Sequence, residues 1–102
     1  MAPSILVKRA RQDARKDAAA AHLLARWYHE GEEGLERDVS LWRRWEVEAA
    51  ERGCADAQFD LGDAYYRGGG GLEVDHATAF AWLRKAALQG KALLTLVPHF
   101  LA

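Results

Sequence analysis

The sequence predicts an all-α fold, an α/α superhelical solenoid of two helix-turn-helix repeats with an extra N-terminal helix. Shifting the 102-residue chain by 37 residues aligns 17–53 with 54–90 without a gap, and thirteen of the 37 aligned pairs are identical. Within each unit, apolar residues recur at the spacing of one helical face. A repeated supersecondary unit of this length is typical of a solenoid, in which neighbouring units bury each other's apolar faces.

The first helix of each unit follows from its apolar stripe and from the glycines that end it. Ala20, Leu24 and Tyr28 lie on one helical face, and Ala57, Leu61 and Tyr65 repeat that face 37 residues later. Glycines at 31, 34, 68 and 71 follow, and glycine permits the positive φ that ends a helix. Each first helix is therefore predicted to end in a tight turn.

The second helix of each unit begins after an aspartate and ends before a glycine. Asp38 and Asp75 stand where a carboxylate accepts a hydrogen bond from the free amides of a first helical turn. Trp45 and Trp82 mark the apolar stripes that follow, and Gly53 and Gly90 are predicted as C-cap residues. Adjacent alanine pairs at 49–50 and 86–87, with the mid-helix glycine at 62, predict close approach of neighbouring helices.

The two ends of the chain depart from the repeat. Residues 1–16 predict an N-terminal helix over 4–16, capped by Ser4, with a partial apolar stripe at Ile5, Leu6, Ala10 and Ala14. Its basic residues are interpreted as a solvated face, since no aromatic residue interleaves with them for stacking on RNA. Residues 91–102 form a diverged apolar tail, in which Pro98 prevents a normal third unit.

Composition excludes several classes of function. With 14 basic and 15 acidic side chains the net charge is −1, so no global field favours nucleic acid or an acidic membrane. The single cysteine, Cys54, cannot form an internal disulfide, which favours a reducing, cytoplasmic location. The apolar run at 5–7 is too short for a signal-peptide core, and no stretch reaches the ~20 apolar residues of a membrane span.

The candidate chemical groups favour structural roles, and the chain is predicted not to be an enzyme. His22 and His29 lie two helical turns apart, but two histidines without a cysteine pair or a His-Glu-x-x-His motif make a poor metal site. Glycines 68–71 follow a helix and lack a P-loop ending. Cys54 is read as a plain thiol, and the tryptophans as core, with Trp42 the least clearly placed. No catalytic residue, metal or cofactor is expected.

The order of the repeated residues resembles the Sel-one-like repeat, a relative of the tetratricopeptide repeat. The second unit matches that pattern closely. The first is more diverged, with Ala25 for glycine and Glu48 for lysine, but it keeps Leu24, Tyr28, Asp38, Trp45, Ala49, Ala50 and Gly53. The matched residues of the second unit are Ala57, Leu61, Gly62, Tyr65, Gly68, Gly71, Leu72, Asp75, Trp82, Lys85, Ala86, Ala87 and Gly90. The resemblance implies a right-handed superhelix that serves as an adaptor or scaffold in protein complexes.

If the chain binds as such repeats do, first helices line the concave surface and their residues away from the core contact a partner. The expected partner-binding residues are His22, Arg26, His29, Phe59, Asp63 and Tyr66. The expected partner is another protein or peptide, without nucleic acid or membrane insertion. The alternative is a self-associating structural fragment that dimerises through its tail, Leu93 to Ala102.

Overall fold

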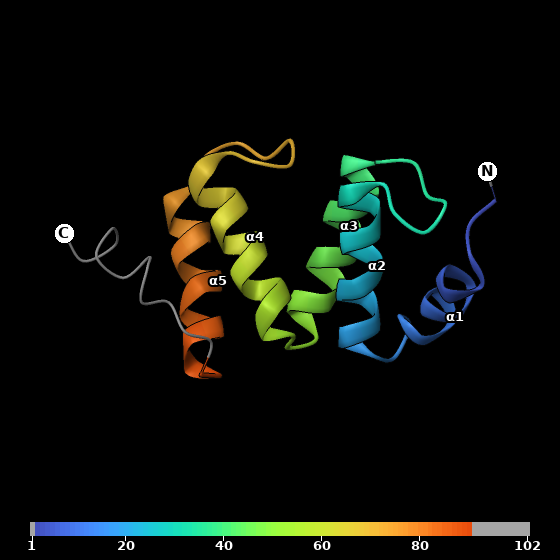
Figure 1. Cartoon of the computed structure of the whole chain (residues 1–102). Helices are drawn as coiled ribbons and strands as arrows, with labels where there is room; N and C mark the ends of the chain where they lie inside the picture. The colour runs from blue at the N-terminus through green and yellow to red at the C-terminus, as the bar shows by residue number, and fades with distance from the viewer. Residues whose placement is uncertain (1, 91–102) are drawn as a thin grey trace.

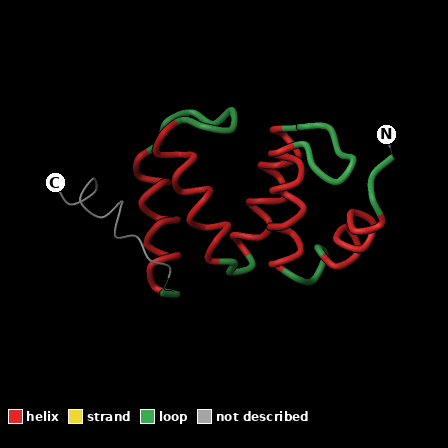
Figure 2. Tube along the Cα trace, viewed as in Figure 1, coloured by secondary structure: helices red, strands yellow, loops and turns green. Residues whose placement is uncertain are grey.

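The computed structural model describes residues 2–90, and the predicted tail at 91–102 lies outside them. The described chain contains five helices and no strand, which confirms the all-α solenoid class (Figures 1 and 2). Helix α1 spans Ile5–Asp13, α2 Ala18–Glu30, α3 Val39–Glu51, α4 Ala55–Arg67 and α5 His76–Leu88. Each helix packs against the next along the chain, with α2 and α3 forming one antiparallel pair and α4 and α5 the other.

The helix ends are fixed by the residues that the repeat pattern indicated. Gly31 and Gly68 end α2 and α4 in the left-handed conformation, with φ of 71° and 74°. Asp38 accepts a hydrogen bond from the amide of Leu41 at 3.0 Å, and Asp75 accepts the equivalent bond from Thr78 at 3.1 Å. Both aspartates are N-caps, as predicted.

The C-terminal ends of α3 and α5 differ by one residue from the prediction. The caps are Arg52 and Gln89, and Gly53 and Gly90 follow them with φ of 98° and 82°. The glycines are needed at the next position because the chain turns through the left-handed region there.

Small residues set the distance between α4 and α5. A Cβ on Gly62 would lie 2.7 Å from the Cγ of Leu83 and 3.1 Å from the carbonyl oxygen of Ala79, so only glycine fits. Ala49, Ala57 and Ala86 on α3, α4 and α5 are also fully buried. The predicted close approach of helices is therefore present, and it compensates for the ~1 kcal/mol that a mid-helix glycine costs.

The N-terminal helix packs on the first repeat with a different face from the one predicted. Ile5 and Leu6 are 80% and 55% exposed, whereas Val7 is fully buried beside Ala10 and Ala14. The predicted stripe was wrong at Ile5 and Leu6. The buried face is formed by Val7, Ala10 and Ala14, at i, i+3 and i+7, because tertiary packing decides which face of α1 docks on the first repeat. The guanidinium of Arg11 also donates to the hydroxyl of Tyr28 at 3.0 Å, joining α1 to α2.

Candidate partner-binding groove

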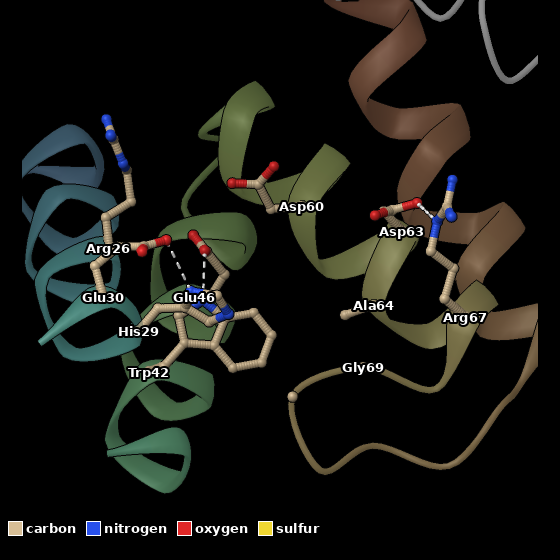
Figure 3. Close-up of a pocket in the computed structure, with 11 residues that line it drawn as sticks. Arg26, His29, Glu30, Trp42, Glu46, Asp60, Asp63, Ala64, Arg67 and Gly69 are labelled. Atoms are coloured by element: carbon tan, nitrogen blue, oxygen red, sulfur yellow. Dashed lines mark hydrogen bonds and ion pairs between the residues drawn. The ribbon is translucent and has the colours of Figure 1, made fainter. Parts of the chain in front are cut away.

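A groove of about 330 Å³ lies where the first repeat meets the second. Helices α2 and α3 form one side of it, and α4 with the turn after it forms the other (Figure 3). We call it the inter-repeat groove, and it is lined by Arg26, His29, Glu30, Trp42, Glu46, Asp60, Asp63, Ala64, Arg67, Gly69 and Gly70.

A buried carboxylate forms the floor of this groove. Glu46 on α3 is 0% exposed, and both of its oxygens are occupied. Its Oε1 lies 2.6 Å from Nδ1 of His22 on α2, and its Oε2 accepts a hydrogen bond from the indole Nε1 of Trp42 at 3.1 Å. The other imidazole nitrogen, Nε2, lies 4.0 Å from a carboxylate oxygen of Asp60 on α4. The imidazole of His22 therefore connects the two repeats.

The contact between His22 and Glu46 changes the protonation of both groups. The hydrogen bond that His22 makes to the carboxylate of Glu46 raises the pKa of His22 above its ordinary 6.5 despite burial, and the charges of Glu46, Asp60 and Asp56 act in the same direction. Burial raises the pKa of Glu46 above its ordinary 4.5, opposed by the hydrogen bond and charge of His22. The pair therefore holds a proton more tightly than either group does in water.

The indole of Trp42 is fixed in place by both repeats. The ring of His29 packs against it with centroids 5.5 Å apart. A Cβ on Gly70 would lie 2.2 Å from Cζ3 of Trp42, so the turn after α4 touches the indole directly (Figure 3). Gly70 also has a positive φ of 62°. Trp42, the tryptophan whose position was least clear from the sequence, is 5% exposed and therefore belongs to the core. It also lines the groove.

Charged side chains of both signs form the rim. Asp63 accepts a hydrogen bond from Nε of Arg67 at 2.7 Å across one turn of α4, and His29 lies 3.1 Å from Glu30. Arg26 on α2 makes no hydrogen bond or ion pair with the residues that the structure describes. The groove thus offers a guanidinium and several carboxylates to a polar segment.

The arrangement provides an incomplete metal site. His22, Glu46 and Asp60 each offer a ligand atom, and these atoms lie within 4.8 Å of one another. Both oxygens of Glu46 are already used by His22 and Trp42, so it would act as an outer partner of His22. Two ligands then remain, fewer than the three or four that zinc sites use. The described residues that line the groove include no cysteine, serine or threonine. Cys54 lies outside it, and burial raises the pKa of its thiol.

Two stretches of the chain, residues 18–54 and 55–91, match the family model of the Sel1 repeat. The chain belongs to the Sel1 repeat family. No curated protein and no solved structure matches it. Sel1 repeats are generally protein-interaction modules and are not typically catalytic. No helix among residues 2–90 is long and apolar enough to cross a membrane.

The two Sel1 repeats place the predicted contact residues in different surroundings. Arg26, His29 and Asp63 line the inter-repeat groove, and His22 lies beneath it on Glu46. Phe59 and Tyr66 are not among the lining residues, and the ring of Tyr66 stacks on His76 of α5 with centroids 4.7 Å apart. The first helices therefore bring four of the six predicted residues together at or beneath this groove.

Three residues that matter in the groove were missed from the sequence: Trp42 as a lining residue, Glu46 and Asp60. A signal for two of them was present in the internal alignment of the Sel1 repeats. The 37-residue shift places Glu46 opposite Leu83 and Trp42 opposite Ala79, both on the core side of α5. A glutamate at a core position is expected to have a hydrogen-bonding or charged partner, because burying an unpaired carboxylate costs too much free energy. The same shift places His22, that partner, opposite Phe59.

Proposed function

We propose that the chain is a non-enzymatic adaptor that binds a segment of a partner protein in the inter-repeat groove. The observation that carries the proposal is the buried carboxylate of Glu46, held by His22 and Trp42 on the groove floor. The second repeat builds the equivalent positions from Phe59, Ala79 and Leu83. The first repeat has polar groups at positions where the same fold is built from apolar ones.

The energetics of burial support this reading. Replacing a buried ion pair by well-packed apolar residues is often neutral or stabilising by ~1 to 4 kcal/mol, so such a pair is weak evidence for stability. The apolar version is present in the second repeat of the same chain, which supports the view that the repeat fold does not depend on the pair. A polar floor beneath a groove instead favours binding, because fixed polar groups orient a ligand that enters.

The rim favours an extended partner segment with side chains of both signs. Arg26 is available on α2 for an acidic group, and carboxylates of Asp60 and Asp63 on α4 face a basic one. Aromatic and arginine side chains are enriched among residues that dominate interface energetics, and His29, Trp42 and Arg26 supply them.

The alternative function is self-association through the C-terminal residues. It rests on the apolar composition of residues 91–102, which include Leu93, Leu94, Leu96, Val97, Phe100 and Leu101. Light scattering on the chain with and without residues 93–102 tests it. A monomer whether or not these residues are present would remove this alternative, and a dimer lost on truncation would support it.

The test of the groove is selection of binding peptides from a displayed library against the purified chain, followed by affinity measurement with each variant. Arg26→Ala with Asp63→Ala removes one charge of each sign from the rim. Glu51→Ala with Arg84→Ala is the matched control, because it makes the same charge change at exposed residues away from the groove. We expect the groove variant to weaken the selected peptides by ~10-fold or more and the control to leave them within ~2-fold.

Circular dichroism of both variants shows whether the helices are retained. A selection that yields no binder, or peptides that bind the groove variant as tightly as the native chain, would contradict the proposal.

A further inference from the structure

A second groove lies on the other side of the first repeat, where α1 and α3 flank α2. Its volume is about 460 Å³, and arginine dominates its lining. Glu48 is the one acidic side chain among the described residues around it. We call it the arginine groove, and it is lined by Arg11, Arg15, Tyr28, Leu41, Arg44, Trp45, Glu48 and Arg52.

The four arginines are not equally engaged. Arg52 pairs with Glu48 at 2.6 Å and donates to the carbonyl oxygen of Ala14, so it holds α1 to α3. Arg11 donates to the hydroxyl of Tyr28. Arg15 and Arg44 make no hydrogen bond or ion pair with any described residue. Two guanidiniums, ten donors between them, therefore face the groove without an acceptor from residues 2–90.

Comparison of the two repeats shows which groove residues belong to the repeat pattern and which are particular to the first repeat. The aromatic pair Tyr28 and Trp45 recurs as Tyr65 and Trp82, so these two residues belong to the repeat itself. Arg44 and Arg52 stand opposite Ala81 and Gln89, so the arginines do not. Gathering like charges costs free energy unless an anion accompanies them. Arg11 and Arg52 have partners within the fold, whereas Arg15 and Arg44 have no hydrogen-bond or ion-pair partner among residues 2–90.

We propose that the arginine groove is a second binding site, which takes a glutamate- or aspartate-bearing segment of a partner protein through Arg15 and Arg44. The planar guanidinium fork matches a carboxylate with two parallel hydrogen bonds, and recognition of acidic motifs by arginine clusters is an established mode. The guanidinium of Arg44 lies 5.5 Å from the centroid of the Trp45 ring, which orients it.

The aromatic residues of this groove favour a peptide over a nucleic acid. Single-stranded nucleic acid binds by stacking bases on open aromatic faces. Tyr28 is buried, and Arg44 lies over the ring of Trp45. The structure thus offers charge to an anionic segment without an open platform for a base.

The test uses the full chain and fluorescence anisotropy with short labelled peptides. The probe alternates glutamate with serine, and its companion carries glutamine in place of glutamate. Arg15→Ala with Arg44→Ala removes the two available guanidiniums without touching the bonds of Arg11 or Arg52. Arg9→Ala with Arg84→Ala removes the same net charge from exposed residues that do not line the groove. Circular dichroism establishes that both variants keep their helices.

We expect the glutamate peptide to bind and the glutamine peptide not to bind. The groove variant should weaken binding by ~10-fold or more, the control by ~2-fold or less, and raising NaCl from ~0.05 M to ~0.5 M should weaken it further. Equal losses in the two variants would show attraction by charge alone and overturn the site. Failure of the glutamate peptide to bind would also overturn it.

Two further arms distinguish other occupants. A phosphoserine peptide or a single-stranded oligonucleotide that binds where the glutamate peptide does not would overturn the carboxylate assignment. The second arm measures the oligomeric state in dilute salt. If the native chain is a dimer and the Arg15→Ala, Arg44→Ala variant is a monomer, the groove binds a second copy of this chain, and the assignment to an acidic segment of another protein is overturned.

Discussion

Nδ1 of His22 and Oε1 of Glu46 lie 2.6 Å apart, and this contact joins the two helices of the first repeat beneath the inter-repeat groove. Glu46 is fully buried, and the indole of Trp42 satisfies its second oxygen. No described side chain has a buried nitrogen or oxygen without a hydrogen-bond partner. The groove floor is therefore a complete polar network, in which the loss of one member leaves the other buried polar groups without a hydrogen-bond partner.

Glu46→Ala should destabilise the chain strongly. It leaves the imidazole of His22 and the Nε1 proton of Trp42 without their acceptor, and breaking a buried pair from one side costs ~3 to 5 kcal/mol. The double variant His22→Phe, Glu46→Leu copies Phe59 and Leu83 of the second repeat and should cost clearly less than Glu46→Ala alone. Urea unfolding followed by circular dichroism measures both. A double variant less stable than Glu46→Ala would contradict the argument that the pair is dispensable for the fold.

The same pair predicts a pH dependence of stability. The pKa of His22 is raised in the folded chain, so its contribution is fully present below 6.5 and is lost as pH rises through the raised pKa. The raised pKa of Glu46 acts with the same sign. The melting temperature should therefore fall as the pH rises above the ordinary pKa of 6.5 for His22 in the native chain, and this fall should be absent in Glu46→Leu. Equal falls in both proteins would assign the titration to other groups.

Gly62→Ala should destabilise the chain although alanine is the better helix former. Its Cβ would lie 2.7 Å from Leu83 Cγ, and overpacking of this kind costs ~1 to 3 kcal/mol. Gly69→Ala is the matched control, because its Cβ would meet only Ala64 Cα, at 4.0 Å. Thermal unfolding of the two variants should separate them clearly. A Gly62→Ala chain as stable as the control would show that α4 and α5 can move apart.

Asp38→Ala should weaken the start of α3. The side chain accepts a hydrogen bond from the amide of Leu41, and loss of such a cap costs ~1 kcal/mol. Asp38→Asn keeps the acceptor and should recover most of that loss. Denaturant midpoints of the three proteins test this, and an asparagine variant no better than alanine would remove the cap as the explanation.

Much of the fold was predictable because its determinants are local or periodic. Asp38 and Asp75 cap helices through hydrogen bonds to amides three residues further along the chain. Gly31 and Gly68 end helices through their own positive φ angles. The close packing at Gly62 followed from a small residue on a helix face. The exposed Ile5 and buried Val7 were missed because the docking face of α1 depends on the angle at which it crosses the first repeat.

The groove was predictable only in part. Arg26, His29 and Asp63 followed from the rule that first helices line the concave surface, and they line the groove. Glu46 and Trp42 belong to a second helix, and Asp60 meets His22 only because α4 packs against α3. Phe59 and Tyr66 are not among the residues that line the groove, and spacing alone could not decide this because the rotation of α4 about its axis is set by tertiary packing.

Nuclear magnetic resonance of the ¹⁵N-labelled chain, titrated with a library-selected peptide, tests the central claim most directly. The account predicts that the largest shifts fall on Arg26, His29, Glu46 and Asp63, and that the indole N–H signal of Trp42 moves with them because it is bonded to the groove floor. Shifts that centre on the outer face of α5, with the Trp42 indole signal unchanged, would contradict the inter-repeat groove as the binding site.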